Sequence, residues 1–295
     1  DRSVSYQKIT KTQKLWFEGN LININGKYVD FSVTPDHRFL LKQQGRTNYE
    51  WMTAQALKET AKSTETRFSF PQFKAIESKH QEEFYAFNFL PDDFEIVVED
   101  ADVPCLAGVR VSEAPRYHQR PHVFSVKIGD AKLDVSFIDS IKRCGSMPYI
   151  KGKKKDRSRL PAIMNMGDFL ELVGWFISEG SVTEGASNVI HIAQREENKI
   201  EISYRKNIKQ LLERMGLNYR ERFSGFTIAG LPIVRIMKLF GDMSGNKHLP
   251  DWIFDLDSGS LKRLFNSMMM GDGSKSGEYY WTISERLKID FSRLC

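Results

Sequence analysis

The sequence contains few cysteines and no long apolar run. Its three cysteines, Cys105, Cys144 and Cys295, are too few and too scattered for a disulfide framework, and they lack the paired spacing of a zinc site. No stretch approaches the roughly 18 consecutive apolar residues of a membrane helix, and the N-terminus carries no secretory signal. These absences favour a reducing, intracellular setting, and we predict a cytoplasmic location.

Positive charge is in slight excess, and part of it is concentrated in one place. The formal net charge is +5. Residues 151–159, "KGKKKDRSR", place six cations and one acid in nine positions. Such clusters attract phosphate backbones, although a solvated linker has the same composition. We take as candidate nucleic-acid contacts Lys151, Lys153, Lys154, Lys155, Arg157 and Arg159.

The length of 295 residues suggests about two domains. Residues 1–75 indicate β-structure, because two alternating apolar runs flank Asn25-Gly26, a strong hairpin signal. Residues 76–160 read as short strands and loops, acidic early and basic late, and they are a possible DNA-recognition insert.

From residue 166 the pattern alternates between helices and strands. The predicted order is a helix opening with a capping-box spacing at Asp168 and Glu171, a possible short strand, a strand, a helix, a hairpin and a helix. The hairpin turns at Ser224-Gly225. After residue 257 an apolar helix recurs, and "YYWTIS" then reads as another strand.

Two apolar helices end in an acid followed by glycine, in "LVGWFISEG" (172–180) and "FNSMMMGDG" (265–273). Gly174 and Ser267 each lie five residues before the acid, where small side chains allow helices to cross closely. Glu179 and Asp272 would then meet, and two close carboxylates need a proton or a divalent cation, for which Mg²⁺ (or Mn²⁺) is suited. Beside a basic surface, such a centre fits phosphodiester hydrolysis. Alternatively, both are ordinary glycine-capped helix ends.

These two segments resemble the paired motifs of the LAGLIDADG (dodecapeptide, DOD-type) homing endonucleases. "NKHLPDWI" (246–253) and "YYWTISERLKIDFSRL" (279–294) resemble the blocks that accompany them in that family. The resemblance implies metal-binding catalytic acids at Glu179 and Asp272, a catalytic Lys247, and β-sheets that lie along a DNA duplex. The sequence departs from the family pattern at Ile177, Met270 and Ser267.

The N-terminal part resembles a second family, the inteins. "VTPDHRF" (33–39) and "YEWMTAQALKE" (49–59) are similar to blocks of the Hint-type splicing domain. The resemblance implies that His37 promotes an acyl shift at the scissile amide and that Thr34 supports it. Because the first-residue nucleophile and the terminal His-Asn pair are not present, we expect an intein fragment that cannot splice itself.

Together these observations predict an α+β chain in three parts. They are a partial Hint-like region (1–75), an intervening region (76–160) and a LAGLIDADG domain (161–295) with an αββαββα half at 166–256 and an incomplete second half at 257–295. The predicted function is a site-specific, metal-dependent DNA endonuclease within a splicing element. The alternative is an inactive nucleic-acid-binding scaffold, maturase-like for RNA splicing. The predicted partners are double-stranded DNA and host exteins, and we expect the complete protein to be a monomer. Two further residues, Gln194 and Lys275, are predicted DNA contacts.

Overall fold

The computed structural model contains two compact units, Asp1–Glu77 and Ser78–Cys295, which are described separately. Both mix helices with strands, which confirms the mixed α and β class predicted from the sequence. The structure describes residues 3–4, 11–12, 14, 16–26, 29–61, 67–71, 74–75, 80–99, 112–113, 123–131, 147–151, 158–185, 187–195 and 199–295.

The first unit is built from short antiparallel pairings around a small core. Strands β2 and β3 form the predicted hairpin, with Ile22 opposite Val33. A second, three-stranded sheet has the order β5-β4-β6, and β1 pairs with β7 in parallel. The buried core residues are Ile22, Phe39, Leu41, Ala54 and Leu57. The elements are β1 (Ser3–Val4), β2 (Ile22–Gly26), β3 (Val29–Val33), β4 (Arg38–Gln43), β5 (Glu50–Thr53), α1 (Ala54–Thr60), β6 (Phe68–Ser69) and β7 (Lys74–Ala75).

The second unit begins with two small sheets. The larger has the strand order β10-β11-β9-β12-β13, and β8 pairs with β14. The predicted short strands of residues 76–160 are therefore present where the structure describes that region. The elements are β8 (Glu83–Tyr85), η1 (Ala86–Phe89), β9 (Glu95–Glu99), β10 (Ser112–Glu113), β11 (Val123–Lys127), α2 (Ile128–Ala131), β12 (Tyr149–Lys151), β13 (Leu160–Pro161) and β14 (Ile163–Asn165).

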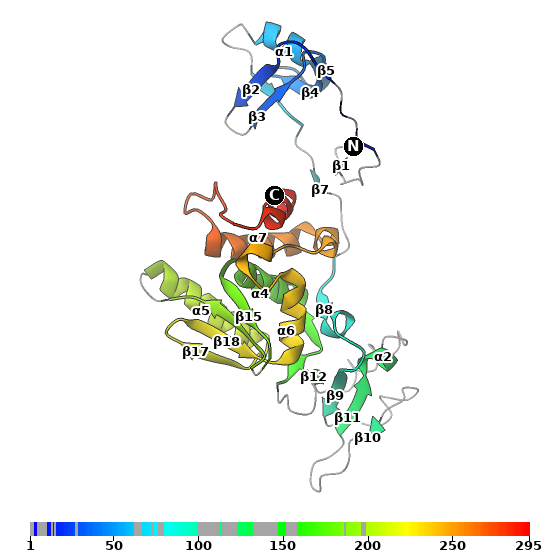
Figure 1. Ribbon diagram of the computed structural model, residues 1–295, viewed down its shortest axis with the longest axis vertical. Helices are drawn as coiled ribbons and strands as arrows, with labels where there is room; N and C mark the ends of the chain where they lie inside the picture. The colour runs from blue at the N-terminus through cyan, green and yellow to red at the C-terminus, as the bar shows by residue number, and fades with distance from the viewer. Residues whose placement is uncertain are drawn as a thin grey trace. The chain divides into compact units, whose positions relative to one another are not determined.

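The part of the second unit from α4 to α6 follows the predicted order of elements. From α4 to α6 the order is αββαββα, including the short extra strand, and the four strands form one antiparallel sheet in the order β15-β16-β18-β17 (Figure 1). The elements are α4 (Met166–Glu179), β15 (Gly180–Thr183), β16 (Val189–Ala193), α5 (Lys199–Arg214), β17 (Tyr219–Arg222), β18 (Gly225–Ala229), α6 (Leu231–Met237), η3 (Lys238–Phe240), η4 (Ser244–Asn246), η5 (Asp251–Asp255), α7 (Ser258–Asp272) and α8 (Glu285–Leu294).

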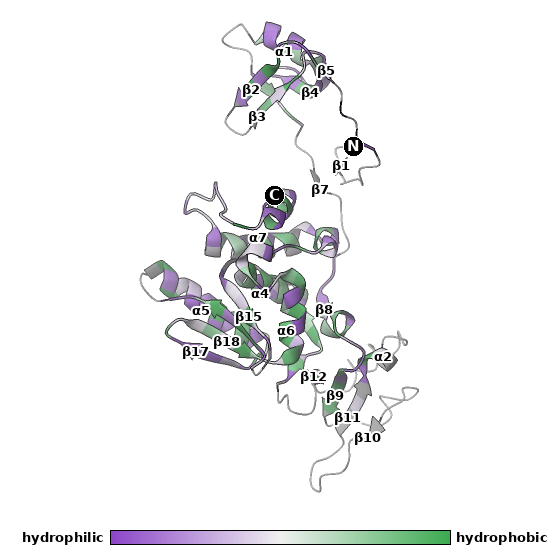
Figure 2. Ribbon diagram, in the orientation of Figure 1, coloured by the Kyte–Doolittle hydropathy of each residue, from purple (hydrophilic) through white to green (hydrophobic). Residues whose placement is uncertain are grey.

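Helix α4 is the centre of the core. It lies between the four-stranded sheet and α7, and it is apolar along most of its length (Figures 1 and 2). Its N-cap is Asn165, whose side chain accepts a hydrogen bond from the Asp168 N–H at 3.0 Å. The capping box predicted at Asp168 and Glu171 is therefore wrong, because both carboxylates instead bind arginine side chains of neighbouring helices.

Helices α4 and α7 run parallel and cross closely where the sequence places small residues. A Cβ added to Gly174 would lie 1.9 Å from Ser267 Oγ and 2.9 Å from the Leu264 carbonyl oxygen. A Cβ added to Gly271 of α7 would lie 2.4 Å from Ser178 Cβ of α4. Only glycine fits at these two points, so the helices approach at the distance that the sequence pattern predicts.

The segment after α7 differs from the prediction. "YYWTIS" forms a single bridge, Tyr280 with Gly273, rather than a strand, and the chain then enters α8. Among the described residues no neighbouring strand pairs with this segment, and an alternating sequence forms a strand only when a partner completes its hydrogen bonds. No helix in the part of the chain that the structure describes is long and apolar enough to cross a membrane.

Candidate carboxylate site at the ends of two helices

Glu179 and Asp272 are the last residues of α4 and α7, and the parallel packing brings both to the same end of the helix pair. Gly180 and Gly273 follow them. A Cβ on either glycine would lie 2.3 Å from a carbonyl oxygen of its own helix, that of Phe176 or of Met269. The way the chain leaves each helix therefore requires the glycine, as the simpler alternative proposed, but it does not account for the acid before it.

Both carboxylates are half-buried, and their environment favours the protonated form. Burial, and then the negative charge of Asp272, raise the pKa of Glu179 to about 7. Burial also raises the pKa of Asp272 to about 6. Glu201, in α5, adds a smaller repulsion that raises the pKa of Glu179 further. Two acids that are costly to ionise side by side are a suitable place for a compensating positive charge.

A phenol and a hydroxyl lie next to the pair. Tyr280 Oη is 3.3 Å from Ser178 Oγ, and Ser178 Oγ donates to the Met268 carbonyl at 3.2 Å. Burial raises the pKa of Tyr280, and the charges of Asp272 and Glu179 raise it further. Ser178 and Tyr280 were not predicted as site residues from the sequence. The alternating pattern in "YYWTIS", which turns Tyr280 inward, is the sequence signal that could have indicated Tyr280.

A cleft of about 550 Å³ opens beside Glu179. Charged and polar side chains line it together with apolar ones from α5 and α7. The lining includes Gln194, Arg195, Glu201, Tyr204, Met270 and Lys275. Gln194 and Lys275, predicted as DNA contacts, thus lie in one cleft with Glu179. Gln194 itself is largely buried, and its carbonyl accepts from Arg205.

The site offers two carboxylates to a cation, not a complete cage. The described residues contain no cluster of three or more His, Cys, Asp or Glu side chains that could hold a metal ion. Within the same residues no Lys or Arg charge lowers the pKa of Glu179 or of Asp272. Mg²⁺ commonly binds through one or two carboxylates and keeps several waters, so the donor set fits this ion.

Lys247 lies in the core rather than in this cleft. Its side chain is buried, and Nζ donates to the Phe176 carbonyl at 3.1 Å and lies 3.3 Å from the centre of the Phe176 ring. Burial lowers the pKa of Lys247 to about 7. The lysine therefore bonds a carbonyl in the last turn of α4, three residues before Glu179.

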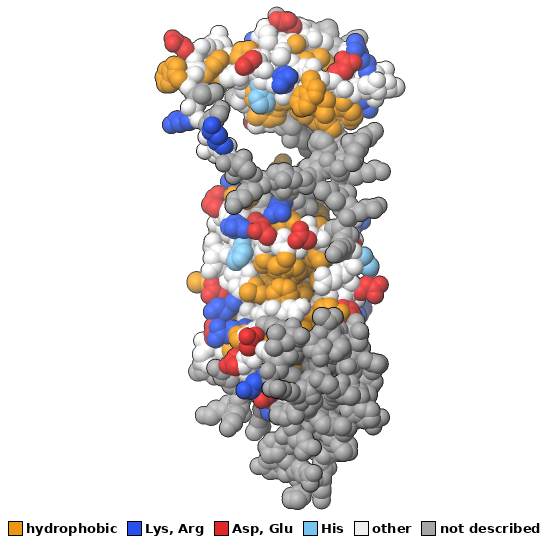
Figure 3. Space-filling view, turned by 90° about the vertical axis from the view of Figure 1, so that its right-hand side faces the viewer, with side chains coloured by type: hydrophobic (Ala, Val, Ile, Leu, Met, Phe, Trp, Pro, Cys, Tyr) orange, Lys and Arg blue, Asp and Glu red, His pale blue; other side chains and the backbone are white. Residues whose placement is uncertain are grey.

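The basic segment is only partly visible. Lys151 is exposed at the end of β12, and the Arg159 guanidinium stacks on Tyr149 at 4.6 Å. Lys153, Lys154, Lys155 and Arg157 lie outside the described residues. Where the face in Figure 3 is described, its Lys and Arg side chains are interspersed with Asp and Glu side chains.

Thr34 and His37 occupy one turn of the first unit. The His37 N–H donates to the Thr34 carbonyl at 3.1 Å, and the exposed His37 ring packs 4.9 Å from Phe39. The Thr34 side chain bonds Asp36 and lowers the pKa of that carboxyl. The two residues are adjacent, as their spacing requires, and the roles implied for them stay predictions.

The chain is similar to the ATP-dependent Clp protease proteolytic subunit of Chlamydomonas moewusii. The identity is 29% over 156 residues, which cover 49% of this chain and 15% of that protein. The chain therefore spans only about a seventh of the length of this relative. No protein-family model matches the chain.

This match contradicts the function predicted from the sequence. The relative is named as a protease subunit, so the predictions of a homing endonuclease, of an inactive nucleic-acid-binding scaffold and of endodeoxyribonuclease activity are corrected, as are the intein and splicing terms. The physical reason is that the motifs are short. Close helix crossing and the helix exits account for their glycines Gly174, Gly180, Gly271 and Gly273 without any nuclease chemistry. The predicted Mg²⁺, DNA and extein partners are not addressed by the match and stay predictions.

Proposed function

We propose that Glu179 and Asp272 form a divalent-cation site, for Mg²⁺ or Mn²⁺, at the end of the α4–α7 pair. One observation supports the proposal most: two half-buried carboxylates converge there, and within the described residues no Lys or Arg charge lowers the pKa of either. A bound cation would offset their repulsion, and water would complete its coordination. When bound, such an ion would supply Lewis-acid polarisation of a ligand oxygen in the adjoining cleft.

We also propose that residues 166–237 have the fold of one LAGLIDADG half. The element order αββαββα, the single antiparallel sheet and the small-residue crossing of α4 support this proposal. It concerns the scaffold alone, because one fold hosts unrelated functions and the chemistry must be argued from the site.

The cation site is tested by titrating the chain with Mn²⁺ in a calorimeter. Glu179→Gln and Asp272→Asn keep the shape of each side chain but remove its charge, and each is expected to weaken Mn²⁺ binding at least about tenfold. The control is Glu184→Gln, because Glu184 is an acid already paired with Arg235 and Lys238. Equal affinities in all four proteins would refute the proposal.

Peptidase activity is a second candidate, which the name of the relative favours. One described trio has the required residue types: Asp257 lies 3.1 Å from His80 and accepts from Ser260 Oγ at 2.8 Å. Its order is unsuited to hydrolysis, since the acid lies between the two groups, whereas a serine nucleophile needs the imidazole next to its hydroxyl.

Labelling with a fluorophosphonate decides this second candidate. We expect no label on the wild-type chain. Labelling that disappears in Ser260→Ala would instead assign peptidase-type chemistry to this trio.

A further inference from the structure

The alignment of the two acids depends on the axial register of α4 and α7. Ser267 is packed on Gly174, Gly271 on Ser178, and Asp272 lies at the level of Glu179. Each pair has the same separation in the sequence, so one register serves the whole crossing. A slip by one residue would move a carboxylate about 1.5 Å along the axis and about 100° around it.

The small-residue contact at the middle of the crossing does not fix this register by itself. The Ser267 hydroxyl donates to the Arg263 and Leu264 carbonyls of its own helix, at 3.1 and 2.9 Å, and so bonds within α7. At the acid end Ser178 Oγ of α4 donates to the Met268 carbonyl of α7. A single hydrogen bond at one end permits α7 to pivot about that point.

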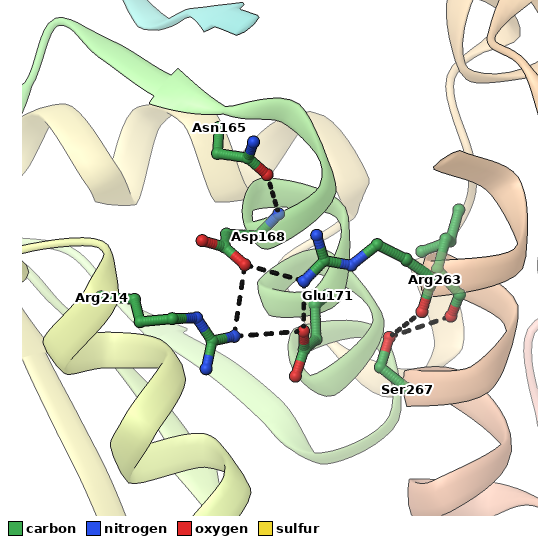
Figure 4. A network of polar contacts seen from close by, with 7 residues as sticks. Asn165, Asp168, Glu171, Arg214, Arg263 and Ser267 are labelled. Atoms are coloured by element: carbon green, nitrogen blue, oxygen red, sulfur yellow. Dashed lines mark hydrogen bonds and ion pairs between the residues drawn. The ribbon is translucent and has the colours of Figure 1, made fainter. Parts of the chain in front are cut away.

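Arg263 supplies a second fixed point at the opposite end. Its Nη2 donates to Asp168 Oδ1 at 2.8 Å and to Glu171 Oε2 at 3.1 Å (Figure 4). The two carboxylates lie one turn apart on α4 and are only 15% and 18% exposed. A guanidinium bound to two successive turns resists sliding in either direction, and charge-assisted bonds are stronger than neutral ones.

Gly167 makes room for this contact. A Cβ added there would lie 2.2 Å from Arg263 Nη1 and 2.8 Å from its Cδ. The arginine side chain thus passes directly over the backbone of the first turn of α4. Glycine is a poor helix former compared with alanine, but at this position it leaves room for the guanidinium, which a larger residue would displace.

Arg214 provides an internal comparison. From α5 its Nη2 donates to the same Asp168 and Glu171 oxygens, at 3.2 and 3.5 Å (Figure 4). It is 47% exposed, close to the 43% of Arg263. Both arginines neutralise the same two acids, but only Arg263 belongs to the helix that carries Asp272.

We infer that Arg263 is a positioning residue that holds α7 in the register at which Asp272 faces Glu179. The inference rests on the proposed cation site, and it adds that the geometry of this site is set from the far end of the helix pair. Loss of Arg263 would let the two carboxylates separate, and a bound cation would replace the lost protein oxygen with water.

The test uses Tb³⁺ as the cation probe, because its luminescence lifetimes in H₂O and D₂O report the number of coordinated waters. Arg263→Met should bind Tb³⁺ at least about tenfold more weakly, with about one more coordinated water. Arg214→Met should match the wild type in Tb³⁺ affinity and in the number of coordinated waters, although it also loses ion pairs to Asp168 and Glu171. Arg263→Lys keeps the charge but not the two-point contact and should fall between them.

The outcomes separate the two proposals. If Glu179→Gln binds Tb³⁺ like the wild type, the cation site itself is refuted. If Glu179→Gln weakens binding but Arg263→Met behaves like Arg214→Met, the site stands and the positioning role is overturned. Circular dichroism checks folding. Should Arg263→Met fail to fold, Gly167→Ala displaces the guanidinium without removing it, and it must show the same loss of affinity and added water.

Discussion

Helices α4 and α7 follow one plan in sequence but have different environments. Each helix is apolar and carries a small residue five positions before its acid, and the chain leaves each helix through a glycine. Yet α4 has nine buried residues, whereas only Ser260, Leu264, Ser267 and Met268 are buried in α7. The reason is position, because α4 has the sheet on one side and α7 on the other.

The difference shows that a repeated motif specifies the local course of the backbone but not how deeply the helix is buried. α4 is held by packing around most of its circumference. α7 is held by one packed face, by its cap and by the polar links to α4. Removing equivalent parts of the two helices should therefore have unequal effects, and the following variants measure that inequality.

The largest difference is expected for two phenylalanines, one in each helix, that differ in burial. Phe169 of α4 is fully buried and stacks on Phe84 with ring centres 3.6 Å apart, whereas Phe265 of α7 is partly exposed and stacks on Phe291. Phe169→Ala should lower the free energy of unfolding by about 3–5 kcal/mol, and Phe265→Ala by roughly a third of that or less. Urea denaturation followed by circular dichroism measures both, and equal losses would contradict the asymmetry.

The crossing itself is tested by adding one methyl group. Gly174→Ala would force a carbon against Ser267 Oγ and the Leu264 carbonyl, and should cost about 1–3 kcal/mol. Gly245→Ala is the control, because nothing lies within 4 Å of the added atom. Ser267→Gly should restore only part of the loss in the double variant, since the Leu264 carbonyl stays in place. Thermal denaturation of the four proteins tests this order.

For the N-caps the order should be reversed, and the cap of α7 should contribute more to stability than the cap of α4. Asp257 caps α7 by accepting from the N–H groups of Gly259 and Ser260, whereas Asn165 caps α4 through one bond to the Asp168 N–H. Asp257→Ala should cost up to about 2 kcal/mol and Asn165→Ala about 1 kcal/mol. Urea midpoints measured on both variants would contradict the interpretation if the Asn165 cap proved the stronger.

The smallest effect concerns pH and Lys247. Its pKa is about 7 in the folded chain, against the ordinary lysine value of 10.5 in the unfolded chain. Between these values the unfolded chain binds more protons, so Lys247 makes the free energy of unfolding rise with pH, by up to about 1 kcal/mol from pH 7 to 8. Glu179, whose raised pKa is also about 7, offsets part of this rise in both Lys247→Met and Lys262→Met. Lys247→Met should lose this rise, and Lys262→Met, at an exposed position of α7, should keep it. A rise that persists in Lys247→Met would assign it to another group.

Much of the fold could be predicted from local patterns. Asn25-Gly26 indicated the first hairpin and Ser224-Gly225 the second, and the structure contains both hairpins. The turns themselves are displaced from the predicted residues, because Asn25 and Gly26 are paired within β2 and Gly225 begins β18. The N-cap of α4 was misassigned, because Asp168 and Glu171 have the spacing of a capping box but are drawn away by arginines distant in sequence. The spacing of residues along the chain does not reveal a binding partner that only folding brings close.

The function was the least predictable part. Short motifs pointed to a nuclease, whereas the similarity found is to a protease subunit. The glycines in those motifs are also those that helix crossing and the helix exits demand, so their presence does not distinguish a catalytic role from a packing role.

The sequence by itself determined the alternation of helices and strands, the close crossing at Gly174 and Ser267, and the presence of an acid at the end of each helix. These follow from side-chain size and periodicity, which are local properties. Tertiary structure alone decided the rest. It buried Lys247 against the Phe176 carbonyl, and it placed Arg263 across two turns of α4. It also raised the pKa of Glu179 and Asp272, because desolvation and charge repulsion depend on neighbours that only the folded chain brings together.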